Sequence, residues 1–274
     1  MSPAPLDLLG VARRVGLDAA ANVARLRPSG RVEVEDTKTS STDAVTAIDR
    51  ASEEFIRSRL LAERPDDTII GEEGDDHVGT SPVSWLVDPI DGTVNFIYGI
   101  PAYAVSIAAE VDGDAVAGYV INVASGESWG AALGEGAWLW ATGIEGQRLV
   151  ATPPPAGGLE QALIATGYNY VAEVRARQAS AVAKMLPQVR DIRRFGSAAL
   201  DLCALASGRV DAYVEQGLQP WDLAAGALIA REVGLEVAGY DASGAFGEPS
   251  HRLVMAAHPA LSEEFFSLVD ACGF

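Results

Sequence analysis

The chain has 274 residues, and 49% of them are hydrophobic, which predicts a folded globule of one large or two modest domains. Lys and Arg number 20 against 38 Asp and Glu, and the resulting net charge of −18 opposes binding to nucleic acid or to an anionic membrane. The same charge would repel a phosphorylated substrate unless a bound metal ion reversed the sign locally.

The two cysteines, Cys203 and Cys272, are too few for a disulfide framework and indicate a reducing compartment. The N-terminal residues mix apolar and charged side chains and contain no continuous signal-peptide core. No stretch approaches the roughly 20 apolar residues that span a bilayer. We therefore expect a soluble, cytoplasmic protein with no membrane or nucleic-acid partner.

Hydrophobic periodicity predicts helices followed by an antiparallel sheet in the first half of the chain. Helices are expected over residues 6–27 and 45–61, with a mobile polar loop over 33–43 between them. The expected strands span residues 68–70, 85–87, 103–111, 115–123, 128–132 and 137–140.

A segment rich in proline and glycine, residues 152–158, is the best candidate for a boundary, because regular elements do not tolerate that composition. It divides the chain into residues 1–151 and 152–274, which we expect to form one compact catalytic unit. In the second half, the expected strands span residues 163–166, 191–195, 210–215 and 253–257. The expected helices span residues 171–186, 197–206, 221–233 and 259–269. Alternating strands and helices predict an α/β layer that binds ligands near strand ends.

Two carboxylates follow the apolar run 85–87: Asp88 comes directly after it, and Asp91 comes three residues later. Pro89 and Gly92 predict a tight turn at the strand end, which would hold the two anionic groups close together. Such groups repel each other unless a cation lies between them, and oxygen ligands favour a hard cation such as Mg²⁺. The alternative is an ordinary surface turn, since Asp-Pro and Asp-Gly are common turn dipeptides.

Two further acidic residues could reach the same place. Glu72 follows the strand 68–70 and could project toward the sheet edge that carries Asp88, although a solvated acidic turn is the simpler explanation of Glu72 alone. Asp222 stands at the start of an apolar helix, where the helix dipole would favour a carboxylate without any metal. Each signal is weak by itself, and their combination is strong.

The chain contains, in this order, Gly71-Glu72-Glu73, Asp88-Pro89-Ile90-Asp91-Gly92-Thr93 and Trp221-Asp222-Leu223-Ala224-Ala225-Gly226. These segments resemble the motifs of the inositol monophosphatases, and residues 38–49, 196–199 and 211–215 supply further matches. The resemblance runs from about Lys38 to the C-terminus. It implies a magnesium-dependent, lithium-sensitive phosphomonoesterase with the layered αβαβα sugar-phosphatase fold, an antiparallel sheet in the N-terminal half, a mixed sheet in the C-terminal half, and a homodimer.

By the same resemblance, the site would hold two Mg²⁺ ions or, as an alternative, three. Mn²⁺ would be able to substitute for Mg²⁺. The implied metal ligands are Glu72, Asp88, the carbonyl oxygen of Ile90, Asp91 and Asp222, with Asp88 bridging both ions. A water activated by the metal would attack phosphorus in line. The implied catalytic residues are Glu72 and Thr93, which would orient that water, and Asp49, which would accept a hydrogen bond from Thr93.

Backbone N–H groups of Gly92 and Thr93 are expected to bind the phosphate. The residues that the resemblance places around the polyol are Asp91, Gly196, Ser197, Ala198 and Glu215. Ser197 is equally well explained as a helix N-cap, and a solvated strand end is the alternative for Glu215. Lys38 could reach the site from its loop or remain a solvated lysine.

We predict hydrolysis of a small polyol phosphate, in the first place inositol 1-phosphate to inositol and phosphate. Histidinol phosphate and other sugar or nucleotide phosphates are the alternative substrates; Val94-Asn95 and Gly196-Ser197-Ala198 favour inositol phosphate over histidinol phosphate. A hypothesis of another class is a non-catalytic acidic interaction protein that retains the metal site. That hypothesis predicts a missing ligand or a missing Thr93–Asp49 pair, and the sequence has all of these residues.

Overall fold

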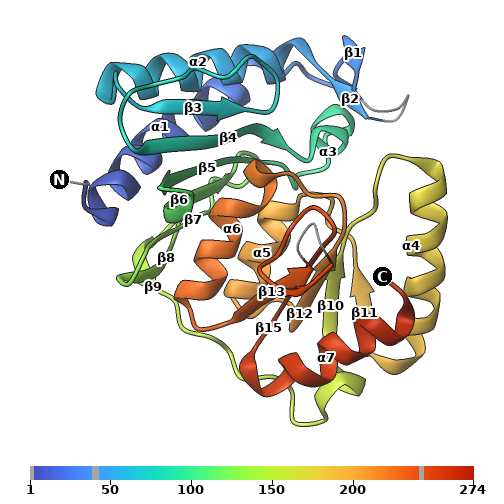
Figure 1. Ribbon diagram of the computed structural model, residues 1–274. Helices are drawn as coiled ribbons and strands as arrows, with labels where there is room; N and C mark the ends of the chain where they lie inside the picture. Colours follow the sequence, from blue (N-terminus) through green and yellow to red (C-terminus); the bar gives the residue numbers. More distant parts are fainter. Residues whose placement is uncertain (1–2, 39–42, 241–243) are drawn as a thin grey trace.

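The computed structural model describes residues 3–38, 43–240 and 244–274. The main helices are α1 (Pro5–Leu26), α2 (Ala47–Glu63), α3 (Thr93–Tyr98), α4 (Ala172–Met185), α5 (Ala198–Ala206), α6 (Pro220–Glu232) and α7 (Pro259–Cys272). Together with two sheets they form five layers: α1 and α2, the first sheet, α5 and α6, the second sheet, and then α4 and α7 (Figure 1). The expected αβαβα architecture is confirmed.

The first sheet has the strand order β3-β4-β5-β6-β7-β8-β9. Its strands are β3 (Thr68–Gly71), β4 (Val83–Asp91), β5 (Ala104–Val111), β6 (Asp114–Asn122), β7 (Ser128–Ala132), β8 (Gly136–Ala141) and β9 (Ile144–Arg148). All neighbouring strands run antiparallel except β3 and β4, which are parallel. The parallel pair matters for function, because it brings the C-terminal ends of β3 and β4 to the same edge of the sheet.

The second sheet is mixed and has the order β11-β10-β12-β15-β13-β14. Its strands are β10 (Leu163–Thr166), β11 (Asp191–Arg193), β12 (Ala212–Glu215), β13 (Glu236–Tyr240), β14 (Phe246–Gly247) and β15 (Leu253–Ala257). β10 runs parallel to both β11 and β12, and the other pairs are antiparallel. Two short 3₁₀ helices, η1 (Gly158–Gln161) and η2 (Leu186–Gln188), lie in its connections.

One core fills the space between α1, α2 and the first sheet. α1 buries Leu8, Val15 and Ala19 among residues that recur with the helical period, so a single stripe of this helix faces the strands. β4 alternates: Trp85 and Val87 point into this core, and Leu86 points to the opposite face. Both faces of β4 are therefore buried, which explains why its sequence is apolar throughout.

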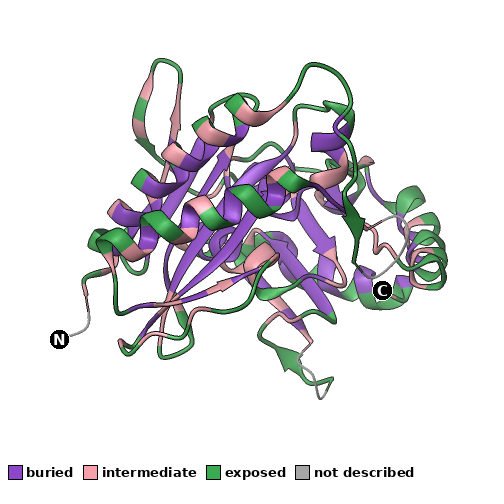
Figure 2. Cartoon of the chain, turned by 90° about the horizontal axis from the view of Figure 1, so that it is seen from above, coloured by how far each residue is buried: buried purple, intermediate pink, exposed green. Residues whose placement is uncertain are grey.

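A second core lies between the two sheets, around α5 and α6. Small residues let α6 approach both the first sheet and α5 closely: a Cβ on Gly118 of β6 would lie 2.8 Å from the Cα of Ala225 in α6, and one on Gly226 of α6 would lie 2.8 Å from a methyl carbon of Leu202 in α5. This shared core joins the two halves of the chain. A third core packs the far face of the second sheet against α4 and α7, and the outer helices keep their exposed faces outward (Figure 2).

Most of the expected elements are found within a few residues of their predicted ends, and β7, β10 and β15 coincide with the prediction. The strands β9, β13 and β14 were not predicted from the sequence. Part of the segment 33–43, which was expected to be a loop, forms β1 (Asp36–Thr37), which pairs with β2 (Ala44–Val45); residues 39–42 lie outside the described residues. In the part of the chain that the structure describes, no helix combines the length and apolar character needed to cross a membrane.

Candidate active site

A β-bulge presents Asp88 and Asp91 on the same side of β4. Asp88 pairs with Ser106 of β5 and Asp91 with Ala104, so three steps along β4 match two steps along β5. In a regular strand, residues three apart point to opposite faces, and the one extra residue reverses that relation. The strand therefore does not stop at Asp88, as the sequence analysis expected, but continues to Asp91 through the bulge that contains Pro89.

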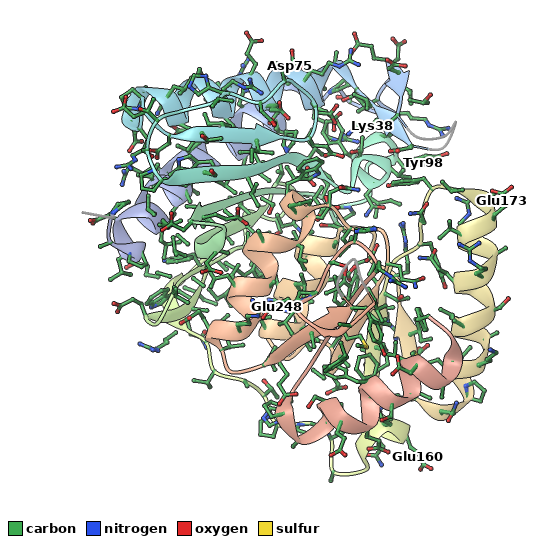
Figure 3. The ribbon with its side chains drawn as sticks, viewed as in Figure 1. Lys38, Asp75, Tyr98, Glu160, Glu173 and Glu248 are labelled. Carbon is green, nitrogen blue, oxygen red and sulfur yellow. The ribbon has the colours of Figure 1, made fainter. Side chains whose placement is uncertain are left out.

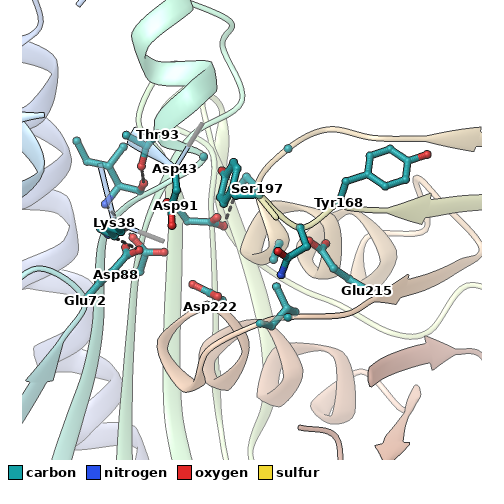
Figure 4. A pocket seen from close by; sticks show the side chains of 18 of the residues that line it. Lys38, Asp43, Glu72, Asp88, Asp91, Thr93, Tyr168, Ser197, Glu215 and Asp222 are labelled. Atoms are coloured by element: carbon teal, nitrogen blue, oxygen red, sulfur yellow. Dashed lines mark hydrogen bonds and ion pairs between the residues drawn. The ribbon is translucent and has the colours of Figure 1, made fainter. Parts of the chain in front are cut away.

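Four carboxylates from three separate segments line one cavity of about 120 Å³. Glu72 comes from the turn after β3, Asp88 and Asp91 from β4, and Asp222 from the first turn of α6. Figure 4 shows these side chains turned toward a common space, with Glu215 on the side away from Glu72. The structure thus brings together the acidic residues that the sequence analysis grouped.

Electrostatic repulsion is strong within this cavity. Burial raises the pKa of Asp88 well above its ordinary value, and the neighbouring carboxylates of Glu72, Asp91 and Asp222 raise it further. Burial also raises the pKa values of the other three. A hard divalent cation would relieve both effects, because it supplies positive charge to oxygen ligands.

Each of these carboxylates also has a partner within the protein. Asp88 accepts from the N–H of Ile90 at 3.0 Å, and Asp222 accepts from the N–H of Gln219 at 2.7 Å, in the helix-capping role foreseen as its alternative. Glu72 accepts from Lys38 Nζ at 2.6 Å. Within the described residues, no three His, Cys, Asp or Glu side chains are already close enough together to hold a metal ion. The acidic residues share a cavity without forming a preassembled ligand cluster.

Lys38 reaches the site. Its ammonium group contacts both Glu72 and Glu73 at 2.6 Å, which decides against the solvated-loop alternative. Burial opposes the charge of Lys38, but the attraction of Glu72 and Glu73 outweighs it and raises the lysine pKa. Among the described residues, Arg194 also places a basic side chain on the cavity wall.

Thr93 connects the cavity to Asp49 in α2. Its hydroxyl lies 3.3 Å from Asp49 Oδ1 and 3.1 Å from the carbonyl oxygen of Ile90. Asp49 is buried and also accepts hydrogen bonds from the backbone and the hydroxyl of Thr46, the N-cap residue of α2. Burial raises the pKa of Asp49 to about 6, although the Thr46 hydrogen bonds act in the opposite direction.

The expected polyol-side residues line the opposite wall. Ser197 donates to Asp91 at 2.6 Å and also caps α5 by accepting from the N–H of Leu200, so the N-cap explanation is confirmed and contact with a polyol stays a prediction. Ala198 and Gly196 lie beside it on the cavity wall. Gly92 has φ +92°, and a Cβ there would lie 3.0 Å from the carbonyl oxygen of Gly196, so only glycine fits this approach.

Glu215 is not a solvated strand end. It accepts from the hydroxyl of Tyr213 at 2.7 Å and packs on Gly167, where a Cβ would lie 1.9 Å from its carboxylate. Burial raises the pKa of Glu215 to about 7, the Tyr213 hydrogen bond lowers it and Asp91 raises it.

Several residues that support the site were not predicted from the sequence. Glu53 of α2 is 3% exposed, accepts from the N–H of Glu73 at 2.7 Å, and fills the space that Gly71 leaves open. Its helical spacing to Ile56 and Leu60 on the buried face was the available signal. Tyr168 and Asn169, which lie on the cavity wall, carried no comparable signal because they belong to an irregular segment.

Buried carboxylates, a hydroxyl held by hydrogen bonds and a polar opposite wall are typical of enzymes that process phosphate groups with metal ions. The model of the inositol monophosphatase family matches residues 7–273, so the chain belongs to that family of phosphatases.

Individual relatives, both sequences and solved structures, agree with this family assignment. An inositol-1-monophosphatase SuhB of Mycobacterium tuberculosis is 44% identical over 97% of this chain and 94% of its own. A solved structure of Mycobacterium tuberculosis SuhB matches with a TM-score of 0.83 and 42% identity, covering 99% of each chain. A Nus factor SuhB of Pasteurella multocida is 35% identical over 92% of each chain. A structure of SaIMPase-II with inositol monophosphate bound matches with a TM-score of 0.74 and 29% identity, covering 95% of this chain and 92% of the other.

Proposed function

We propose that the protein hydrolyses a small polyol phosphate, with inositol 1-phosphate as the first candidate, and that it requires Mg²⁺ at the acidic cavity. The observation that carries the proposal is the placement of Glu72, Asp88, Asp91 and Asp222 in one cavity with the polar wall that contains Glu215. The name of the mycobacterial relative and the inositol monophosphate in the SaIMPase-II structure support this substrate class.

The donor set suits a hard cation, because it consists of carboxylate and carbonyl oxygens whose mutual repulsion a divalent ion would offset. The proposed ligands are Glu72, Asp88, the Ile90 carbonyl, Asp91 and Asp222, divided between two ions. When bound, Mg²⁺ activates water as a Lewis acid and neutralises charge on the phosphate and the leaving oxygen. Lys38 has to release Glu72 for that residue to serve as a ligand.

The protein's own residues orient the reactants. The Thr93 hydroxyl donates its proton toward Asp49 and Ile90, so its lone pairs remain to accept a hydrogen bond from the attacking water. The N–H groups of Gly92 and Thr93, where α3 begins, would bind phosphate oxygens. Glu215 would accept a hydrogen bond from a polyol hydroxyl and so select among substrates.

A substrate panel with variants tests the proposal. We expect magnesium-dependent phosphate release from inositol 1-phosphate to exceed release from histidinol phosphate and from nucleoside phosphates. Asp88→Asn should lower kcat by more than about 100-fold. Mutation of a residue that only hydrogen-bonds to a metal ligand already reduces activity by about 10–100-fold, and loss of a ligand itself should cost more. Glu160→Gln, on an exposed residue remote from the cavity (Figure 3), is the control and should leave turnover unchanged. A near-normal kcat in Asp88→Asn would refute the metal role of this residue.

The alternative of a non-catalytic interaction protein has one specific observation in its favour, the name Nus factor for the Pasteurella multocida relative. It predicts that the wild-type protein binds Mg²⁺ but releases phosphate from no member of the panel. Calorimetric titration with Mg²⁺ beside the activity assay separates the two functions.

A further inference from the structure

A second pocket, of about 470 Å³, adjoins the acidic cavity and has charged side chains of the opposite sign. Residues 168–170 and Arg194 belong to the walls of both. Arg31, between α1 and β1, and Arg175 of α4 add two more guanidinium groups, and the described residues that line this arginine pocket include no Asp or Glu. In a chain with 38 acidic and 20 basic residues, such a local excess of positive charge favours an anion.

Uncharged groups hold two of these arginines in place. The guanidinium carbon of Arg31 lies 3.9 Å from the centre of the Tyr98 ring. Nη1 of Arg175 donates to the carbonyl oxygens of Asn169 and Tyr170 at 3.2 and 3.3 Å. Stacking and carbonyl contacts orient a guanidinium group without cancelling its charge, and stacking uses the face of the group rather than its in-plane N–H donors.

The positive charge of the arginine pocket has no counter-charge in the part of the chain that the structure describes. Elsewhere arginines pair with carboxylates: Arg14 contacts Glu63 at 2.6 Å, and Arg64 contacts Asp67 at 2.8 Å. None of the three pocket arginines forms such an ion pair with a described residue. Guanidinium groups that line one pocket repel one another, and a bound anion offsets that repulsion.

Phosphate is the anion that matches both the donors and the location. The planar guanidinium group presents pairs of N–H donors at the spacing of phosphate oxygens. The apolar side chains of Val34, Val94 and Ile97 also line the pocket, and a wall of low polarity strengthens the attraction between opposite charges. The acidic cavity next to it attracts phosphate only when a metal ion has reversed its charge.

We propose that the arginine pocket binds a phosphate group outside the acidic cavity. This phosphate has two possible sources with the same chemistry: a second phosphate of the substrate, bound while the first one reacts, or the reacting phosphate itself as it enters or leaves the cavity. The wall shared by the two pockets puts either of them beside the reaction. The inference deepens the proposed function and rests on it for the identity of the ligand.

Calorimetric titration of the full chain with inorganic phosphate tests the pocket directly. The titration is done in EDTA at low ionic strength, because without divalent ions the acidic cavity repels phosphate. We expect saturable binding that Arg31→Gln and Arg175→Gln each weaken by at least about fivefold, since each removes a charge-assisted hydrogen bond. Arg177→Gln, on an exposed arginine of α4 that does not line the pocket, is the matched control and should change the Kd by less than about twofold.

Steady-state kinetics of Arg31→Gln with Mg²⁺ distinguish the two sources. A loss of kcat/KM that is at least about fivefold larger on inositol 1,4-bisphosphate than on inositol 1-phosphate identifies a second substrate phosphate, and equal losses on both identify the reacting phosphate.

The proposal is overturned if the wild-type protein shows no saturable phosphate binding, if Arg177→Gln weakens binding as much as the pocket variants do, or if Arg31→Gln loses activity on neither substrate. Phosphate binding in EDTA needs no turnover. A protein that binds phosphate in this way but hydrolyses no phosphomonoester would therefore refute the proposed function and leave the phosphate pocket standing.

Discussion

Replacing Asp201 by asparagine is expected to stabilise the folded protein at neutral pH. Asp201 is a buried residue of α5, and within the described residues neither oxygen of its carboxyl group has a hydrogen-bond partner. Burial raises the pKa of this carboxyl group well above its ordinary value, and Glu215 and Asp91 contribute to the increase. The folded state therefore binds a proton that the unfolded chain has already released. Folding is therefore coupled to the uptake of one proton. The free energy of unfolding falls as the pH rises from the pKa of Asp201 in the unfolded chain toward its pKa in the folded protein, because the concentration of free protons decreases.

The magnitude follows from this linkage. Aspartate in an unfolded chain has a pKa of about 3.9, and each pH unit above it adds about 1.4 kcal/mol to the free energy needed to protonate Asp201, or about 4 kcal/mol at about pH 7. Asparagine needs no proton and occupies almost the same volume. Its amide group also lacks partners at this position, which costs about 1–3 kcal/mol if the neutral acid is better accommodated. The expected net gain is about 1–4 kcal/mol at about pH 7.

Urea unfolding of wild type and Asp201→Asn at about pH 5 and about pH 8 measures the effect, since the variant's advantage should grow by about 1.4 kcal/mol per pH unit. In thermal unfolding a gain of 1 kcal/mol corresponds to a Tm increase of about 2–4 °C for a chain near this size. Asp76→Asn, on an exposed aspartate, is the control for loss of a negative charge. An equal difference between wild type and Asp201→Asn at both pH values would show that Asp201 is ionised in the folded protein.

Three further substitutions probe the fold and the site. In urea unfolding, Gly118→Ala should lower stability by about 1–3 kcal/mol, because the new Cβ would meet the backbone of Ala225. The control Gly247→Ala has open space around its Cβ and should change stability little. Equal effects of the two substitutions would contradict the packing account. Glu215→Gln should change the preference among polyol phosphates by about fivefold with Mg²⁺ affinity unchanged, and uniform losses on all substrates would count against a selective role. Lys38→Met should tighten Mg²⁺ binding by about two- to fivefold in calorimetry, since it removes a cation that competes for Glu72; weaker binding would indicate that Lys38 organises the site.

Local sequence patterns were sufficient for most helices and strands. The alternation of strand and helix in the second half, and the apolar stripe of α1, required no knowledge of neighbouring elements. β9 (Ile144–Arg148) escaped notice because its polar and glycine residues form no apolar alternation, and its pairing with β8 is what makes it a strand. β13 (Glu236–Tyr240) was missed for a related reason, since its partner β15 lies later in the chain.

The sequence by itself determined which oxygen-bearing side chains are available and in what order they occur, because motif spacing is a property of the chain. Tertiary structure decided how they face one another. Only the pairing of β4 with β5 creates the bulge that turns Asp91 to the side of Asp88. Likewise, only packing between the sheets removes Asp201 from water, because burial and the charges around a group depend on residues distant in sequence.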